Sequence, residues 1–306
     1  MINYTLKPGD TLYNLAIQFR IPVKAILSHN PGLDPYNLRV GQKIVLPVES
    51  DDSWQYMQAK PQSQTQPQSQ SQSRPQDELI VFAAASLKNV LNDAKYAYIA
   101  EHPDVKITYN FGGSGALQQQ IEQGRPSDVF FSAGKAQMKA LQDKGLMLDN
   151  SVKTFLGNKL VMITPRNGNG FTSFDDLRKP SVRKIAIGDP KTVPAGQYAM
   201  QTFERLNLLD AVKPKLIYGE DVRQVLSMVE NRIAQAGVVY STDALNNSYV
   251  QISDVASYDT HDAIVYPIGI VKSSKQQKLA QNYIDFLMSD SGKKLFEKYG
   301  FIVPLM

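Results

Sequence analysis

Five segments of the sequence place small or hydroxyl-bearing residues at corners, where an expected strand ends and an expected helix begins. They are FAAAS ending at Ser86, NFGGSG with Ser114, GDPKTVPAG with Ala195, YGEDV with Val222 and VVYSTDA with Tyr240. Small residues at the first three corners let the backbone approach a ligand closely. Four corners present the N–H groups of a helix start, and the three hydroxyl side chains can add further donors. Together these groups could hold a small, negatively charged ligand.

A site of this kind suits a fully ionised anion, and it requires no Lys or Arg. Each helix N-terminus attracts negative charge by about 0.3–1 kcal/mol, or ~2 kcal/mol when partly buried. Hydrogen bonds to the charge add to this attraction. A protonated oxyanion is disfavoured, because its own proton would face another donor. The pattern therefore predicts an oxyanion site built from neutral groups.

Each corner also has a structural explanation when it is taken alone. A serine such as Ser86 is commonly a plain helix cap, and GGSG is commonly just a turn. Val222 would be a core residue, and Tyr240 an ordinary strand residue. Only the combination of all five corners in one chain favours anion binding over these roles.

The corners lie in a long region, from Leu79 to the end of the chain, where apolar strands alternate with amphipathic helices. The expected strands are LIVFAA, KITYNF, DVFFS, KLVMIT, KIAIGD, KLIYG and GVVY, each with a helical stretch after it. This alternation predicts an α/β fold with mostly parallel sheets covered on both faces. In such sheets ligands bind beyond the carboxyl ends of the strands, where the helices begin.

The same region resembles the periplasmic molybdate-binding proteins of bacterial ABC importers. The resemblance rests on FAAASL, GGSGAL, RPSDVFFSAG, GNKLVMITP, IGDPKTVPAGQYA, GEDVR, GVVYSTDA and KKLFEKYGFIVP, in this order. It implies a two-lobed type II periplasmic-binding-protein fold over 78–306, with lobe 1 at about 78–158 plus 266–306 and lobe 2 at about 159–265.

The resemblance also implies the ligand, its contacts and its partners. Molybdate or tungstate would be bound through its oxygens by Ser86 and Ser114 from the first lobe and by Ala195, Val222 and Tyr240 from the second. No cofactor is implied, and the partners would be the permease and the ATPase of the importer. We expect a monomer that is not an enzyme.

The N-terminal residues 1–48 form a separate small unit. YTLKPGDTLYNLA, HNPG and LRVGQKIVLP resemble a LysM domain, which implies a βααβ fold that binds peptidoglycan or another polymer containing N-acetylglucosamine. The resemblance places the glycan contacts in two loops, at Gly9, Asp10, Thr11 and Leu12 and at Asn30, Pro31, Gly32 and Leu33. Asp10 and Thr11 are also good helix caps, and Leu12 is a plausible core residue. A DNA-binding helix pair is the competing interpretation, which the flanking strands and the near-balanced charge oppose.

A linker at 49–77 separates the two units. Its centre, KPQSQTQPQSQSQSRPQ, contains almost nothing that a core could bury, so we expect it to be disordered.

Composition excludes several classes of protein. The 306 residues are 42% hydrophobic and 20% charged, with a net charge of +4 and no cysteine. Disulfides and thiolate metal sites are therefore excluded, and no basic stripe indicates nucleic-acid binding. The beginning of the chain has no secretory signal pattern. An extracytoplasmic location, at the cell wall or membrane surface, is thus expected from the two resemblances alone.

Two other functions stay open. A cell-wall hydrolase would explain the LysM pattern, but it needs paired carboxylates or a nucleophile with its base, which we do not find. The match of Ser291 to Lys294 with S-x-x-K lacks its companion motifs. A ligand-sensing regulator could use the same two-lobed fold, but it would need a DNA-binding helix pair at the N-terminus.

Overall fold

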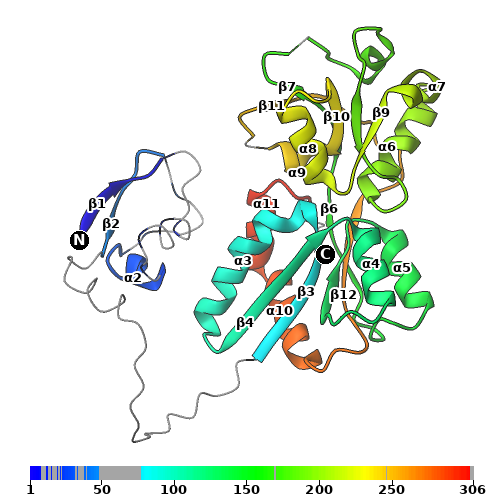
Figure 1. Cartoon of the computed structure of the whole chain (residues 1–306). Helices are drawn as coiled ribbons and strands as arrows, with labels where there is room; N and C mark the ends of the chain where they lie inside the picture. The colour runs from blue at the N-terminus through cyan, green and yellow to red at the C-terminus, as the bar shows by residue number, and fades with distance from the viewer. Residues whose placement is uncertain are drawn as a thin grey trace, which may run out of the picture. The chain divides into compact units, whose positions relative to one another are not determined.

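The computed structural model describes two compact units, Met1–Gln76 and Asp77–Met306 (Figure 1). The described residues are 1–7, 12, 15, 19, 21, 23–31, 33, 38, 40–47, 77–168, 170–245 and 247–303. The linker predicted at 49–77 lies outside them except for Asp77. That residue is already the first of a strand, so the boundary of the prediction was wrong by one residue. The strand extends to Asp77 because its backbone pairs with Val105 of the neighbouring strand.

The N-terminal unit is a small hairpin with helical segments. Strand β1 (Ile2–Thr5) pairs antiparallel with β2 (Lys43–Leu46), and helix α2 spans Val23–Ser28. Much of the first predicted helix lies outside the described residues. Its apolar positions at Leu12 and Leu15 are helical and buried. These leucines form one cluster with Leu6, Ile26, Ile44 and Leu46. A core of this size fits the shallow fold predicted for a LysM domain.

The first lobe of the larger unit contains a five-stranded sheet in the order β4-β3-β5-β12-β6. The strands are β3 (Asp77–Ala84), β4 (Val105–Gly112), β5 (Val129–Phe131), β6 (Lys153–Gly157) and β12 (Val265–Ile270). Strand β3 is parallel to β4 and β5, whereas β12 is antiparallel to β5 and β6. The return of β12 therefore adds the C-terminal part of the chain to this lobe.

Helices cover both faces of the first sheet (Figure 1). They are the 3₁₀ turn η2 (Ala85–Leu87) and the helices α3 (Lys88–Glu101), α4 (Ser114–Glu122), α5 (Lys135–Asp143), α10 (Gln277–Met288) and α11 (Asp290–Lys298). Helices α3, α10 and α11 contact one another, and α4 contacts α5. Both faces of the sheet are thus buried, as the continuous apolar strands predict.

The second lobe repeats this layout with the sheet order β11-β7-β10-β8-β9. Its strands are β7 (Leu160–Pro165), β8 (Ile185–Gly188), β9 (Leu216–Gly219), β10 (Ala236–Tyr240) and β11 (Val250–Val255). Strands β8, β9 and β10 are parallel, and β7 pairs antiparallel with β10 and β11. Every residue of β8 and β10 is buried. The predicted two-lobed α/β fold is confirmed.

The helical elements of the second lobe include the three that open at predicted corners, which are α6 (Pro194–Arg205), α8 (Val222–Glu230) and α9 (Ser241–Ala244). The others are η3 (Phe174–Arg178), α7 (Leu209–Val212) and η4 (Lys213–Lys215). Helix α8 buries Val222, Val225, Leu226 and Val229, which recur at helical spacing. That apolar stripe fixes the helix on its sheet and so fixes the position of its N-terminus.

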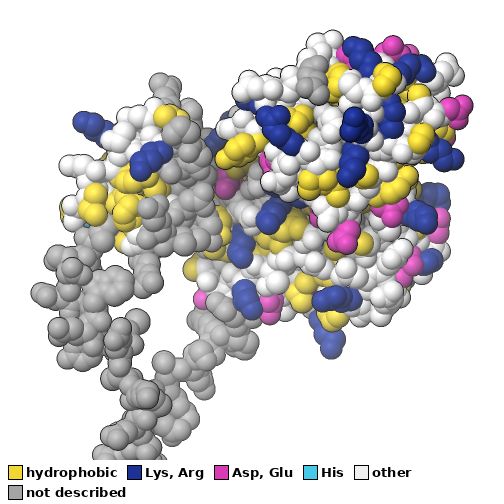
Figure 2. All heavy atoms as spheres, turned by 45° about the horizontal axis from the view of Figure 1, so that its top comes forward, with side chains coloured by type: hydrophobic (Ala, Val, Ile, Leu, Met, Phe, Trp, Pro, Cys, Tyr) yellow, Lys and Arg dark blue, Asp and Glu magenta, His cyan; other side chains and the backbone are white. Residues whose placement is uncertain are grey.

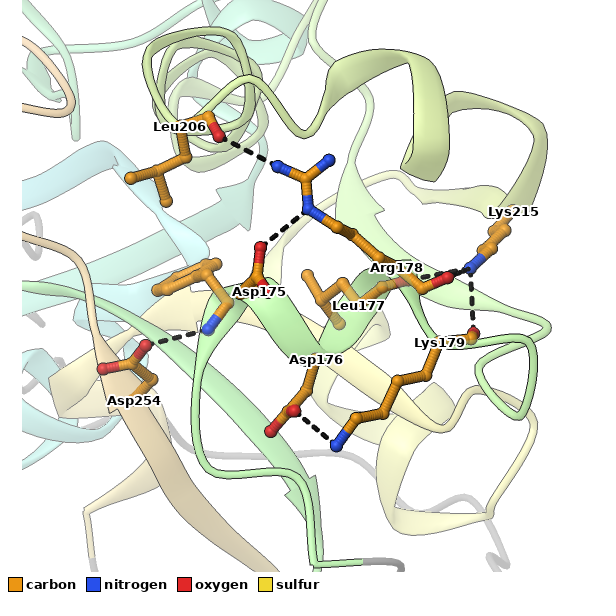
Figure 3. Close-up of polar contacts among 9 residues, drawn as sticks. Asp175, Asp176, Leu177, Arg178, Lys179, Leu206, Lys215 and Asp254 are labelled. Atoms are coloured by element: carbon orange, nitrogen blue, oxygen red, sulfur yellow. Dashed lines mark hydrogen bonds and ion pairs between the residues drawn. The ribbon is translucent and has the colours of Figure 1, made fainter.

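Polar contacts hold together the part of the second lobe shown in Figure 3. The Lys215 ammonium donates to the carbonyl oxygens of Leu177, Arg178 and Lys179, at 2.8, 3.2 and 3.1 Å. The Phe174 N–H donates to the Asp254 carboxylate at 2.9 Å. The bonds from Lys215 satisfy carbonyl groups at the C-terminal end of η3, and the bond from Phe174 connects the start of η3 to β11. The basic residues of this region therefore have structural partners.

Figure 2 shows the charged side chains on one face of the molecule. On the face drawn in Figure 2, Lys and Arg side chains are spread over both lobes, with Asp and Glu between them. None of the helices in the described part of the chain has the length and apolar composition that crossing a membrane requires.

Candidate functional site

All five residues predicted to bind an anion line one cavity between the lobes. The space that protein atoms leave free there is about 200 Å³, including the part that opens to solvent. The lining residues are Ala84, Ala85, Ser86, Gly112, Gly113, Ser114, Ala133, Val193, Pro194, Ala195, Asp221, Val222 and Tyr240. Two of the predicted residues come from the first lobe and three from the second, so the fold unites corners that are more than 150 positions apart in the sequence.

The start of α8 directs one backbone N–H group to the cavity. The Asp221 carboxylate caps this helix by accepting from the N–H groups of Arg223 and Gln224, at 2.8 and 3.0 Å. Val222 is the first residue of the helix, and its N–H has no acceptor within the helix. The cap thus satisfies the second and third N–H groups and leaves that of Val222 for a ligand.

The start of α6 has a similar arrangement. Pro194 is the first residue of this helix and has no N–H. The N–H groups of Gly196 and Gln197 both donate to the Val193 carbonyl, at 3.0 and 3.2 Å. Ala195 lies between Pro194 and Gly196, and its N–H is left without an intrahelical acceptor. Ala195 is fully buried and lines the cavity, so its N–H is available to a ligand there.

Ser114 opens α4 and contributes a hydroxyl from the first lobe. Its side chain is 1% exposed, and its Oγ accepts a hydrogen bond of 3.0 Å from the Ala133 N–H. Because a backbone N–H can only donate, the proton of the Ser114 hydroxyl is free to donate to another acceptor. The structure thus holds Ser114 as a donor at the edge of the cavity.

Ser86 and Tyr240 supply the other two hydroxyl groups. The Ser86 Oγ lies in η2, 3.1 Å from the Tyr266 hydroxyl. The Tyr240 hydroxyl donates to the Ala133 carbonyl at 3.2 Å, which is a long bond for two oxygen atoms. Burial raises the pKa of the Tyr240 hydroxyl well above its usual value. Tyr240 therefore stays protonated, and an anion in the cavity would compete with the Ala133 carbonyl for its single proton.

The charges around the cavity agree with a site of neutral donors. No Lys, Arg or His is among the described residues that line it, and Asp221 is the one charged residue there. Next to the site, burial raises the pKa of Asp243 to about 7, although the charge of Arg223 opposes this shift. The negative charge of Asp243 is therefore reduced near neutral pH, which lowers its repulsion of an anion.

The two lobes are in contact across the cavity. The Gly115 N–H of α4 donates to the Thr192 carbonyl of the second lobe at 2.7 Å. The Arg223 guanidinium donates to the Asn89 side chain of the first lobe at 2.6 Å. Together with the bond from Tyr240 to Ala133, these contacts define a closed arrangement of the lobes.

The glycan-binding residues predicted in the N-terminal unit are only partly described. Gly9, Asp10, Thr11 and Gly32 lie outside the described residues. Leu12 is 3% exposed and belongs to the core of the unit. Pro31 is exposed and Leu33 is half-buried, so both can be reached from solvent.

Asn30 has a structural role in this unit. Its amide nitrogen donates to the carbonyls of Ile26 and Val45, both at 2.7 Å, and its amide oxygen accepts from the Val45 N–H. These bonds tie α2 to β2 and leave few donors or acceptors free. A role of Asn30 in glycan binding remains a prediction.

Other candidate chemistry does not assemble in the described residues. No group of three or more His, Asp or Glu side chains there could hold a metal ion. Ser291, from the S-x-x-K match, lies at the start of α11, where its hydroxyl is 2.9 Å from that of Ser289. Ser289 caps this helix by accepting from the Gly292 N–H. The match is thus part of a helix cap.

Two residues behind the cavity were not found from the sequence. Tyr266 and Asn158 do not line the cavity, but the Tyr266 hydroxyl contacts both Ser86 and the Asn158 amide. Tyr266 lies in β12, a strand that was not predicted, and Asn158 lies between β6 and β7. No local pattern of residue types marks either position.

Comparison with protein families matches two regions of the chain. Residues 79–302 match the family described as bacterial extracellular solute-binding protein, and residues 4–47 match the LysM domain. The first match covers both lobes, and the second covers α2, β2 and the last two residues of β1. Both predicted resemblances are confirmed.

Individual relatives resemble the two-lobed unit. The Bacillus subtilis lipoprotein YvgL, named as an ABC transporter substrate-binding protein, is 46% identical over 73% of this chain and 85% of its own. The molybdate-binding protein ModA of Haemophilus influenzae is 37% identical over 73% and 89%. A solved substrate-binding domain assigned to a molybdenum ABC transporter of Clostridium difficile has 39% identity and a TM-score of 0.59, over 74% and 99%.

Proposed function

The chain belongs to the family of bacterial extracellular solute-binding proteins, and from this premise we propose that its two-lobed unit binds molybdate or tungstate for an ABC importer. The names of its relatives support molybdate as the ligand class. The permease and the ATPase of the importer would be its partners. No covalent step is needed, since the task is to capture an ion and release it.

The observation that carries this proposal is the composition of the cavity. Ser86, Ser114 and Tyr240 offer hydroxyl groups, while Ala195 and Val222 offer N–H groups at helix starts. A cavity lined by donors without Lys or Arg suits an ion that is fully deprotonated at neutral pH. In a site shielded from water, the preorganised dipoles attract a dianion more strongly than they do in solution.

Closure of the lobes would link binding to delivery. The donors come from both lobes, so an ion in the cavity stabilises the arrangement that brings them together. The permease would then distinguish the closed form from the open one. The contacts between Gly115 and Thr192 and between Arg223 and Asn89 belong to the closed arrangement.

The LysM domain would hold the protein at the cell wall. We propose that it binds peptidoglycan or a related polymer of N-acetylglucosamine, with the Gln/Ser/Pro-rich segment connecting it to the two-lobed unit. Such a tether would put the protein outside the cytoplasm, where it would work as a monomer. The choice between molybdate and tungstate would depend on the fit of the ion to the cavity.

Calorimetric titration of the full chain tests the ligand. We expect one molybdate or tungstate per chain, with sulfate and phosphate bound at least about 100-fold more weakly, a difference of about 2.8 kcal/mol. Sulfate is the demanding control because it is also a tetrahedral dianion. Comparable affinity for sulfate would contradict the proposed specificity.

Co-sedimentation with insoluble peptidoglycan tests the tether. The full chain should pellet with peptidoglycan and be released by soluble N-acetylglucosamine oligomers. Cellulose is the matched control, because its glucose units lack the N-acetyl groups. Equal pelleting with both polymers, or none with peptidoglycan, would argue against a tether to the cell wall.

A further inference from the structure

A chain of buried hydrogen bonds runs from the crossing between the lobes to the proposed anion site. Asn158 lies between β6 and β7, where the chain passes from one sheet to the other, and it is only 3% exposed. Its amide contacts the hydroxyl of Tyr266, which in turn contacts that of Ser86. Tyr266 is fully buried and Ser86 is 6% exposed, so water competes little for these bonds.

The orientation of the Asn158 amide follows from its partners. Its oxygen accepts from the Lys159 N–H at 2.8 Å and from the Ser241 hydroxyl at 3.0 Å. A backbone N–H can only donate, so the oxygen must face Lys159. The amide nitrogen therefore faces the other way, 2.9 Å from the Thr242 Oγ1 and 3.1 Å from the Tyr266 hydroxyl.

This orientation determines where the Tyr266 proton goes. The Asn158 nitrogen donates, so the Tyr266 oxygen accepts in that bond. Burial raises the pKa of Tyr266 well above its usual value, so the hydroxyl keeps its proton. Among the described residues, its remaining hydrogen-bond partner is the Ser86 Oγ, at 3.1 Å. Tyr266 therefore donates to Ser86.

Ser86 is thereby left as a donor. Because its oxygen accepts from Tyr266, its own proton points elsewhere, and Ser86 lines the cavity. On the other side of the cavity, Ser114 is held as a donor in the same way by the Ala133 N–H. The two serines have the same hydrogen-bonding state although their partners differ in type.

We propose that Tyr266 and Asn158 are positioning residues, which fix Ser86 as a hydrogen-bond donor to the bound oxyanion. This proposal rests on the proposed function. Neither residue lines the cavity, so both would act on the ion through Ser86. Cooperative polarisation along the chain of bonds also strengthens the final donor.

A double-mutant cycle measured by molybdate titration of the full chain tests this role. Tyr266→Phe removes only the hydroxyl and should weaken molybdate binding about tenfold. Ser86→Ala should weaken it about 10- to 100-fold. In the Ser86→Ala background, Tyr266→Phe should change Kd by less than about twofold, because the residue through which it acts is gone. Additive effects would overturn the proposal.

Two further variants make the result decisive. Tyr283→Phe is the matched control, because Tyr283 is also fully buried and bonds to the Tyr109 hydroxyl at 2.6 Å, without lining the cavity. It should lower stability without changing Kd. Asn158→Ala should weaken binding in the same direction as Tyr266→Phe and also lose its effect in the Ser86→Ala background. An unchanged Kd in both Tyr266→Phe and Asn158→Ala would also overturn the proposal.

The outcomes separate this proposal from the proposed function. Failure of the unmutated chain to bind molybdate or tungstate would refute the function itself. The unmutated chain could instead bind molybdate, with weaker binding in Ser86→Ala. If Tyr266→Phe then changes Kd independently of Ser86, only the positioning role fails.

Discussion

Replacement of Gly115 by alanine should weaken molybdate binding by about 100-fold or more while the ligand-free protein stays folded. A Cβ at this position would lie 2.7 Å from the Cα and the carbonyl oxygen of Thr192, on the other side of the cavity. Real Cβ atoms do not approach backbone atoms so closely, and backbone cannot rotate away as a long side chain can. The new methyl group would therefore keep the lobes apart, and it would also displace the hydrogen bond from Gly115 to Thr192.

The affinity falls because only the closed arrangement brings all donors to the ion. When the closed fraction falls by a given factor, the apparent Kd rises by the same factor. The stability of the open form should not decrease, since alanine is more favourable than glycine in a helix by up to about 1 kcal/mol. Titration calorimetry and thermal unfolding of the ligand-free chain measure the two effects separately.

Gln119→Ala is the matched control for this experiment. Gln119 lies on the same helix, is exposed and makes no side-chain hydrogen bond to the second lobe in the described part of the chain. It should leave both Kd and the melting temperature nearly unchanged. Normal molybdate affinity in the Gly115→Ala variant would show that binding does not need the observed closed contact.

Ser114→Ala should weaken molybdate binding about 10- to 100-fold. The hydroxyl of Ser114 is held as a donor, and a hydrogen bond to a charged group contributes about 1.5–3 kcal/mol. The mutation also leaves the buried Ala133 N–H without its acceptor, at 3.0 Å in the unmutated protein. That loss should reduce the free energy of unfolding by about 1–3 kcal/mol, so both quantities must be measured.

Ser127→Ala distinguishes binding from stability. Ser127 is also a buried serine of the first lobe, but its Oγ has no hydrogen-bond partner and it does not line the cavity. Its replacement should leave Kd unchanged and should not destabilise the protein. If the Ser114→Ala variant is less stable but binds molybdate with an unchanged Kd, the role of Ser114 is only structural.

Local signals account for the part of the site that the sequence predicts. Ser114, Ala195 and Val222 each follow an apolar strand or loop and open a helix, and such corners can be recognised within a few residues. The order of strands and helices then places the corners at one edge of each sheet. The buried runs of β8 and β10 likewise show in the sequence as apolar segments.

The additional strands were harder to predict. Strands β6, β11 and β12 were not expected, and β12 joins the first sheet antiparallel after the chain has passed through the second lobe. Strand β11 has a bulge between Ile252 and Asp254 and alternates less regularly than a buried strand. Pairing of this kind depends on distant partners, which give no short-range signal.

The sequence by itself determined the division into a LysM domain and a two-lobed unit, the α/β class and the five corners that could meet an anion. The α/β class and the corners follow from periodicity and the chemistry of helix starts, which are local, whereas the LysM domain and the two lobes follow from the resemblance of short motifs to known families. Only the tertiary structure decided that the corners share one cavity, that Gly115 meets Thr192 across it and that Asn158 and Tyr266 orient Ser86. Hydrogen bonds between residues far apart in the chain depend on distances below about 3.5 Å, and such distances are fixed only when both lobes are packed.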